Sequence, residues 1–462
     1  MSALLVIGAL EAVICVVCLL GAKRNLRRFA LLLLIVTAPL EVYRTELAGL
    51  NLSLFRLSLA IALATVLLVP GSRRTLRQMR SNPVLLAYLT FAAVMLLSLL
   101  TMSENSGLGA RLLAQVILGV TALATVSSLA ATEPVARIVR YILIGAGLPL
   151  VAAAWQRIAP TLDVNDALPF LSLLPVPEGL EVTRGSLPTF EETPRMRGTF
   201  GDPSHFGTYL LIVGAAALAS AVAASRRGAT HAVLGLCGLL MCIVLAVFGT
   251  YSRTAWMGLV AAIAIVTLSL WHRLAADPAR WRRAAVLPLV IACSFIALTA
   301  PFASAINGRL DPSAAGNVVS NSAHERTVTV ALDDLIGYPL TGVGVADLGP
   351  QLQQAVRSSG AHSSYLTVAA ELGVPGLLLL LLGFMLVVRM LHRRMMTSTD
   401  PALLMLQGLA AGYIGFAIAN LSYDLWWDDF HWLVIGLIIA ACSDRSACDA
   451  PPQRLTPGGK GP

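Results

Sequence analysis

Apolar runs of about 20 residues recur along most of this 462-residue chain and restrict what it can fold into. A bilayer offers backbone groups no hydrogen-bond partners, so runs of this length predict helices. The sequence lacks the short alternating pattern of a membrane barrel. Hydrophobic residues make up 57% of the chain and charged residues only 13%, which is far from an ordinary soluble domain. The chain is therefore predicted to be an all-α polytopic membrane protein.

The apolar runs predict twelve or thirteen spans, depending on whether one short run is counted. They cover residues 3–22, 29–40 (the short run), 52–70, 83–101, 112–131, 139–155, 205–224, 231–249, 255–271, 284–302, 365–388, 402–420 and 429–442. We expect residues 1–442 to form one transmembrane domain and residues 443–462 to form a disordered cytoplasmic tail. Two long connections, at 156–205 and 303–363, are expected to be functional loops.

Basic residues gather at every second connection between the predicted spans, which indicates that those connections face the cytoplasm. The clusters are Lys23, Arg24, Arg27 and Arg28; Arg73, Arg74, Arg77 and Arg80; Arg137 and Arg140; Arg226 and Arg227; Arg273, Arg280, Arg282 and Arg283; and Arg389, Arg393 and Arg394. Both long loops then face outward. The net charge of +8 follows from this topology and excludes a nucleic-acid partner. We also expect a retained N-terminal anchor, because no basic segment precedes the first apolar run.

The second long loop is a polar segment in an otherwise apolar chain. Ser322 and Glu325 form a capping-box pattern, and Val328, Leu332 and Leu335 follow at helical spacing until Gly337. A second short helix is predicted over residues 350–358. Between the two helices the phrase TGVGVADLG carries Gly342 and Gly344. Its backbone amides could bind an anion, although a plain turn is the commoner meaning of such spacing.

Arginines recur where the outward loops meet the spans. Arg195 and Arg197 end the first long loop, and Arg253 lies beside Ser252 in a very short outward turn. The planar guanidinium keeps its charge and binds phosphate oxygens through paired hydrogen bonds. We therefore predict a phosphate-bearing ligand at the outer membrane face. The structural alternative for each arginine is a snorkelling or salt-bridged interfacial residue.

His362 ends the second long loop, and histidine can take up a proton near neutral pH. A lone interfacial histidine is more often structural than catalytic, but the arginines nearby favour a base beside a bound phosphate ester. His205 and His324, which precedes Arg326 by two residues, are the competing candidates. No cluster of cysteine, histidine and carboxylate demands a metal, and neither a metal nor a cofactor is expected. Asp333 and Asp334 have a plain explanation as a polar helix face.

Four phrases in order carry a resemblance to the O-antigen ligase and O-antigen polymerase superfamily of bacterial envelope glycosyltransferases. They are RMRGTFGDPSHFGTYL, GTYSRTAWMGL, ERTVTVALDDLIGYPLTGVG and HSSYLTVAAELGVPGLLLL, within residues 195 to 390. The matched positions are Arg197, Gly198, Thr199 and Phe200; Ser252 and Arg253; Arg326, Pro339, Leu340, Gly342 and Gly344; and His362, Glu371, Gly373 and Gly376. The chain departs from the family at Ser363 and at Asp202-Pro203-Ser204, where asparagine is frequent, and this leaves the acceptor type open.

The resemblance implies a GT-C-like fold in the bacterial inner membrane and a site that faces the periplasm. It implies transfer of a glycan from an undecaprenyl-diphosphate carrier to a hydroxyl of a glycan, lipid-core or protein acceptor, by metal-independent inversion. The predicted catalytic residues are His362, Arg253 and Arg197. The predicted substrate-binding residues are Arg326, Arg195, Gly342, Gly344 and Ser252. Membrane lipids and envelope polysaccharide assembly proteins are further expected partners.

The main rival is a multi-span transporter or flippase for an envelope lipid or solute. Transporters commonly place ionisable residues near mid-membrane, whereas the charges of this chain gather at the outer face apart from Glu11. A non-catalytic scaffold in an export complex is a third alternative. The sequence does not separate a ligase from a polymerase, because both use the same donor.

Overall fold

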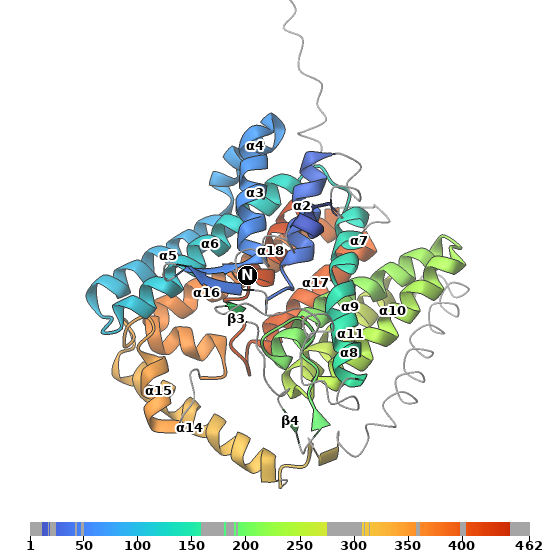
Figure 1. Cartoon of the computed structure of the whole chain (residues 1–462). Coiled ribbons are helices and arrows are strands. Elements are labelled where there is room, and N and C mark those ends of the chain that lie inside the picture. The colour runs from blue at the N-terminus through green and yellow to red at the C-terminus, as the bar shows by residue number, and fades with distance from the viewer. Residues whose placement is uncertain are drawn as a thin grey trace, which may run out of the picture.

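The computed structural model is a bundle of helices, and it describes only part of the chain. The described residues are 12–16, 18, 25–41, 44–47, 50–158, 180–181, 189–190, 193–274, 307–308, 310–313, 315–356, 361–397 and 403–443. Most of the predicted first span and all of the predicted span 284–302 lie outside them, as does the tail beyond residue 443. Figure 1 shows α17 and α18 inside the bundle, with α5 and α6 on one side and α9, α10 and α11 on the other.

Six described helices are long and apolar enough to cross a membrane. They are α5 (Pro83–Thr101), α6 (Ser106–Ala130), the pair α7 and α8 (together Val135–Arg157), α9 (Pro203–Arg226), α10 (Thr230–Gly249) and α16 (counted over Ser364–Met396). The helix α3 (Leu54–Leu68) and the stretch Pro70–Ser81, which holds α4 and a 3-10 turn, add a seventh if this pair, bent by 99°, is one span. The predicted polytopic helical architecture is thus confirmed.

Shorter apolar helices complete the bundle where the sequence predicted further spans. They are α2 (Leu26–Thr37), α11 (Arg253–Leu274, counted as an apolar helix over Arg253–Ser269), α17 (Leu403–Ala419) and α18 (Asp429–Cys442). In α9 the apolar 18-residue window is entirely buried, because α10, α11 and α17 pack around it. Helices that are apolar on every side fit this arrangement, since each either contacts other helices or meets lipid.

Short strands occur in the connections that precede α3 and α9, and the all-α prediction did not include them. β1 (Arg44–Leu47) and β2 (Leu50–Ser53) form an antiparallel hairpin, and β3 (Leu180–Glu181) pairs with β1. β4 (Thr189–Phe190) and β5 (Thr193–Pro194) form a second small ladder. These pairings satisfy backbone groups of the first long loop and place its end beside the start of α9.

The second long loop contains α14 (Ala315–Gly337) and α15 (Leu348–Val356), which lie along the lower edge of the bundle in Figure 1. The helix predicted to start at Ser322 begins seven residues earlier, so the capping-box pattern lies inside it. The predicted end at Gly337 is confirmed. The predicted apolar face is wrong, because Val328 and Leu332 are exposed while Thr327 and Ala331 are buried. At these four positions the smaller side chains are buried, and the larger ones are exposed.

A kink in α16 (Ser364–Thr397) holds this loop in place. Pro375 has no N–H to donate to the carbonyl of Glu371, and the amide of Val374 donates to Pro339 instead of to Ala370. The two helix carbonyls left over accept hydrogen bonds from the amides of Gly344 (3.2 Å) and Val343 (2.9 Å). Two of the phrases that carried the family resemblance therefore lock onto each other.

Glycines make that contact possible. A Cβ on Gly342, whose φ is 67°, would lie 2.3 Å from the carbonyl of Glu371, and a Cβ on Gly373 would lie 2.7 Å from the backbone of Leu340. Asp347 fixes the next turn, since its carboxylate accepts hydrogen bonds from the amides of Glu104 and Asn105 ahead of α6. The loop is thus packed between α16 and the turn from α5 to α6.

Candidate functional site

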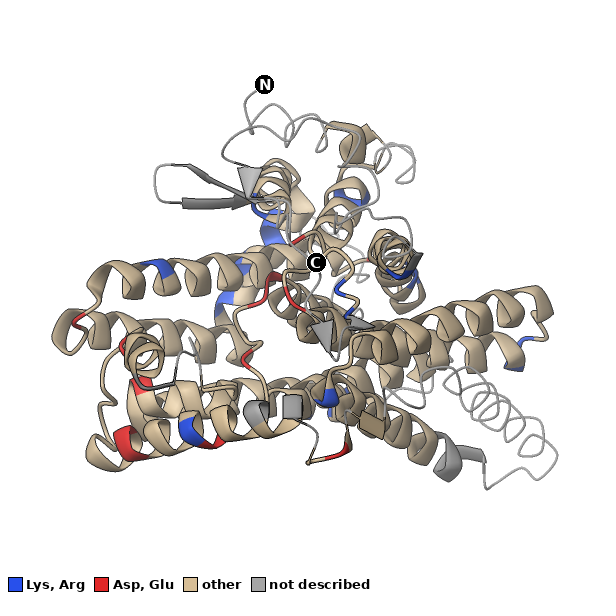
Figure 2. Cartoon of the chain, turned by 60° about the horizontal axis from the view of Figure 1, so that its bottom comes forward, with Lys and Arg blue, Asp and Glu red and all other residues tan. Residues whose placement is uncertain are grey.

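The site lies at the end of the bundle that holds the α5–α6 turn, residues 195–202, residues 250–253 and residues 420–428, which we call the outer end. Figure 2 shows long stretches of helix with few charged residues. Direct contacts join the segments. Arg195 Nε donates to the carbonyl of Thr250 (2.8 Å), and the hydroxyls of Ser252 and Ser204 lie 3.2 Å apart. All of the predicted arginine positions except Arg326 belong to this assembly or contact it.

Residues 197–200 form a tight turn that explains the R-G-T-F phrase. Gly198 has a φ of 56°, and a Cβ there would lie 2.8 Å from the ring of Phe206. Gln156, just before the end of α8, accepts hydrogen bonds from the amides of Arg197 and Gly198, each 3.0 Å long. Phe200 is buried 5.8 Å from Phe206 between ring centroids. The phrase therefore builds a rigid entry into α9.

The first two predicted arginines are held close to the apolar core. The residue Arg197 is only 3% exposed, and Arg195 is half-buried. Burial lowers the pKa of both guanidinium groups, and the negative charge of Asp202 opposes that shift. Both groups stay charged at physiological pH, because a guanidinium keeps its proton in proteins. The outer end thus holds two cations near one carboxylate.

Arg253 begins α11 and reaches across to the second long loop. Its Nη2 donates to the side-chain oxygen of Asn321 in α14 at 2.8 Å. The preceding Ser252 is buried, and the turn that carries it includes Tyr251 with a left-handed φ of 49°. This strained turn aims Arg253 toward the loop that carries His362. The contact with Asn321 links the two parts of the predicted site.

His362 also has a left-handed backbone, with φ of 54°, immediately before α16. Its ring centroid lies 4.1 Å from that of His324 and 6.2 Å from that of Tyr423. The next residues are anchored, since Ser364 donates its amide to Asn420 (3.0 Å) and its hydroxyl accepts from the amide of Leu425 (3.0 Å). Burial lowers the pKa of His362, and the charge of Asp202 partly offsets this. His362 is thus neutral near pH 7.

Asp202 is the shared electrostatic neighbour of this group, although the sequence comparison marked it only as a departure. It caps α9, where its Oδ1 accepts the amide of Ser204 at 2.6 Å. Its charge also acts on Tyr423, whose hydroxyl bonds to it and whose pKa is raised well above the ordinary value, chiefly by burial. Ser363, the other departure, caps α16 by accepting the amide of Leu366. Both departures thus keep the capping chemistry that asparagine would supply.

The remaining predicted binding residues occupy other environments. Arg326 is exposed on α14. The amides of Gly342 and Gly344 donate to the carbonyls of Tyr338 and Glu371, so in this structure they are engaged in a turn and not directed at an anion. Substrate binding by Gly342 and Gly344 stays a prediction. Within the described residues no group of three or more His, Cys, Asp or Glu is placed to hold a metal ion.

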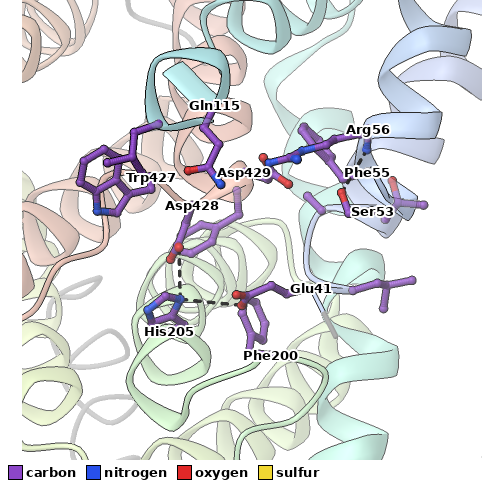
Figure 3. A pocket seen from close by; sticks show the side chains of 15 residues that line it. Glu41, Ser53, Phe55, Arg56, Gln115, Phe200, His205, Trp427, Asp428 and Asp429 are labelled. Atoms are coloured by element: carbon purple, nitrogen blue, oxygen red, sulfur yellow. Dashed lines mark hydrogen bonds and ion pairs between the residues drawn. The ribbon is translucent and has the colours of Figure 1, made fainter. Parts of the chain in front are cut away.

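Sequence reasoning missed a second group at the outer end, which Figure 3 shows. His205 Nδ1 lies 3.1 Å from Asp428 and 3.7 Å from Glu41. These side chains line a cavity of about 260 Å³ together with Arg56, Gln115 and Asp429. The sequence analysis named His205 only as a competing base, and the other signal was the run of acidic and aromatic residues in YDLWWDDF between two apolar helices. Burial raises the pKa of Asp428, and the charge of His205 opposes this shift.

Comparison with protein families gives one match. Residues 236–381 match the family model described as O-antigen ligase. The matched segment covers less than half of the chain and includes Arg253, α14 and His362. It ends inside α16 and leaves out residues 195–202 and the 420–428 turn. No curated protein matches the chain.

Proposed function

We propose that this protein, which belongs to the O-antigen ligase family of enzymes, transfers a glycan from an undecaprenyl-diphosphate carrier to an acceptor hydroxyl at the periplasmic face of the inner membrane. The family match and the membrane spans support a polysaccharide-assembling membrane enzyme in place of the rival transporter. The donor identity, the facing of the site and the residue roles are our proposal.

The observation that carries the mechanism is the convergence of His362 and the arginines on one end of the bundle. Arg195, Arg197 and His362 all respond to the charge of Asp202, and Arg253 contacts the helix that stacks His324 on His362. Positive groups that are already held in place around a leaving group stabilise the negative charge that it gains in the transition state. A neutral histidine next to them supplies a base.

In the proposed step, an unprotonated ring nitrogen of His362 takes the proton of the acceptor hydroxyl as its oxygen attacks the anomeric carbon. The bond from that carbon to the diphosphate oxygen breaks, and its electron pair leaves with undecaprenyl diphosphate. Arg197 and Arg253 stabilise the charge on the departing diphosphate. One direct displacement inverts the anomeric centre, and the bonds formed and broken need no metal.

The test is transfer by purified His362→Ala protein supplied with lipid-linked glycan and acceptor. We expect the rate to fall by roughly 10²- to 10⁴-fold, the usual contribution of a general base. His324→Ala is the matched control, because its ring lies 4.1 Å from His362 and yet has no assigned proton transfer. Full product formation by His362→Ala would remove this histidine from the mechanism, and a larger loss in His324→Ala would reassign the base.

A second variant tests the arginine contacts. Arg253→Lys keeps the charge but loses the planar fork, so we expect weaker donor use than in the wild type. Full activity in that variant would argue against paired phosphate contacts. Gene deletion separates the two family activities: unmodified acceptor beside long carrier-linked chains indicates a ligase, and acceptor carrying one repeat unit indicates a polymerase.

A further inference from the structure

The cavity lined by Glu41, Arg56, Gln115, His205, Asp428 and Asp429 is built from segments far apart in the chain. They come from the end of α2, the starts of α3 and α9, the middle of α6 and the turn before α18. Figure 3 shows their side chains pointing toward one another across the cavity. The proposed transfer chemistry uses none of these six residues. A polar hollow of this kind, at the outer end of an apolar bundle, needs a separate explanation.

Asp428 supplies an observation that points to a ligand. Its side chain is only 10% exposed, and one carboxylate oxygen faces His205 at 3.1 Å. The other oxygen, Oδ2, is buried and has no hydrogen-bond partner among the described residues. A buried acceptor without a donor is costly, so such an atom calls for a donor group from a bound molecule.

Charge narrows the class of molecule. Glu41, Asp428 and Asp429 give the lining three carboxylates, against the single guanidinium of Arg56 and the imidazole of His205. The charge of Arg56 acts on Asp429, whose carboxylate also bonds to Ser53. The lining is therefore anionic and would repel a phosphate, which the arginines outside the cavity attract. A ligand here is expected to be neutral or cationic and to donate hydrogen bonds.

The size and lining of the cavity further restrict the class of molecule that it can bind. A cavity of about 260 Å³ lies below the range of roughly 300–1,000 Å³ typical of drug-sized ligands, so it suits one small ring. Trp427 contributes to the lining beside the carboxylates. An aromatic face together with hydrogen-bond acceptors matches a sugar ring, which has an apolar face and hydroxyl donors at its edge.

The cavity is also next to the proposed base. His205 lies in its wall, and the ring of Tyr423 is 5.6 Å from His205 and 6.2 Å from His362 between centroids. One aromatic residue thus separates the cavity from the histidine that would deprotonate the acceptor. A sugar held in the cavity would place the neighbouring part of its chain near His362.

We infer that this cavity binds one uncharged or amino-substituted sugar ring of the acceptor glycan, with Asp428 and Gln115 contacting its hydroxyl groups. The assignment of this sugar to the acceptor rests on the proposed function. The prediction that the cavity binds a sugar rests on the cavity alone. Donor diphosphate and acceptor sugar are then sorted by charge, between the arginines near Asp202 and the cavity lining, in which carboxylates outnumber basic groups.

Binding is tested first, without any transfer. Ligand-observed NMR would follow the full-length purified protein with methyl glycosides of glucose, galactose and mannose, with glucosamine, and with glucose 6-phosphate. We expect at least one neutral or amino sugar to bind with a dissociation constant on the order of millimolar, and the phosphate at least about tenfold more weakly. Asp428→Asn and Gln115→Ala should weaken binding at least about fivefold.

Glu104→Gln is the control, because Glu104 is an exposed carboxylate of the α5–α6 turn outside the cavity. It should bind sugar as the wild type does, and melting temperatures would show that each variant is folded. Absence of sugar binding by the wild type, equal binding of glucose 6-phosphate, or unchanged binding in both folded cavity variants would overturn the inference.

Transfer kinetics then test the acceptor assignment. Gln115→Ala should raise the acceptor KM and leave the donor KM unchanged, whereas Arg253→Lys should affect the donor. A raised donor KM in Gln115→Ala would refute acceptor binding. Sugar binding that depends on Asp428 in a protein without transferase activity would contradict the proposed function and leave the sugar site standing.

Discussion

Residues 193–202 and helix α14 both carry arginines that the sequence analysis predicted to bind a diphosphate. The two regions differ in how deeply these arginines are buried. Arg197 is 3% exposed, with its amide bonded to Gln156 and its charge near Asp202. Arg326 stands exposed on α14. An exposed cation keeps its hydration. A buried cation loses hydration, and this free-energy cost must be offset by a nearby anion or by hydrogen bonds. Burial is therefore the better guide to which arginine serves a ligand.

Truncating each arginine in turn tests whether the buried one contributes more to transfer than the exposed one. We expect Arg197→Ala to lower the transfer rate about 100-fold or more, as removal of one charge-stabilising donor does elsewhere. Arg326→Ala should stay within roughly threefold of the wild type, because its side chain is already solvated. Initial rates at saturating donor would be compared between variants of equal melting temperature. Equal losses in the two variants would end the distinction drawn here.

The second comparison concerns what fixes the loop that holds α14. Gly342→Ala forces a Cβ to within 2.3 Å of the Glu371 carbonyl and leaves a residue with a side chain at φ of 67°. Backbone strain and overpacking together should cost about 3 kcal/mol in the free energy of unfolding. Gly107→Ala in α6 is the control, since nothing lies within 4 Å of its added Cβ. Denaturation in detergent would measure both variants, and a Gly342→Ala protein as stable as Gly107→Ala would disprove the interlock.

The smallest expected effect tests the shared role of Asp202. Burial puts the pKa of His362 below its ordinary 6.5, so activity should be lost only as pH falls through that lowered pKa. The charge of Asp202 raises this pKa, so Asp202→Asn should move the acidic limb of the pH–rate profile to still lower pH, by less than about one unit. Asparagine keeps the cap on α9. An acidic limb that does not move, or that moves to higher pH, would show that Asp202 does not raise the pKa of His362. Asp311→Asn, at an exposed carboxylate, is the control.

The helical spans could be predicted because lipid leaves the backbone few alternatives. The predicted runs 83–101 and 429–442 coincide with α5 and α18 to the residue. The start of α14 could not be predicted, because Ser322 and Glu325 form a capping-box pattern inside a longer helix. His362 and Arg253 could be singled out from their residue types and positions. The sequence did not predict that Asp202 and Tyr423, or His205 and Asp428, lie together. Each pair forms through a contact between segments more than 200 residues apart.

The kink of α16 has a consequence for how the protein is made. A peptide group that is buried without a hydrogen-bond partner is costly, so the carbonyls of Ala370 and Glu371 favour a state in which Val343 and Gly344 are already docked. Those donors precede α16 in the chain and leave the ribosome before it. Membrane insertion of this span and folding of the loop that carries the site should therefore be one cooperative event during biogenesis, with the loop supplying the partners that the helix lacks.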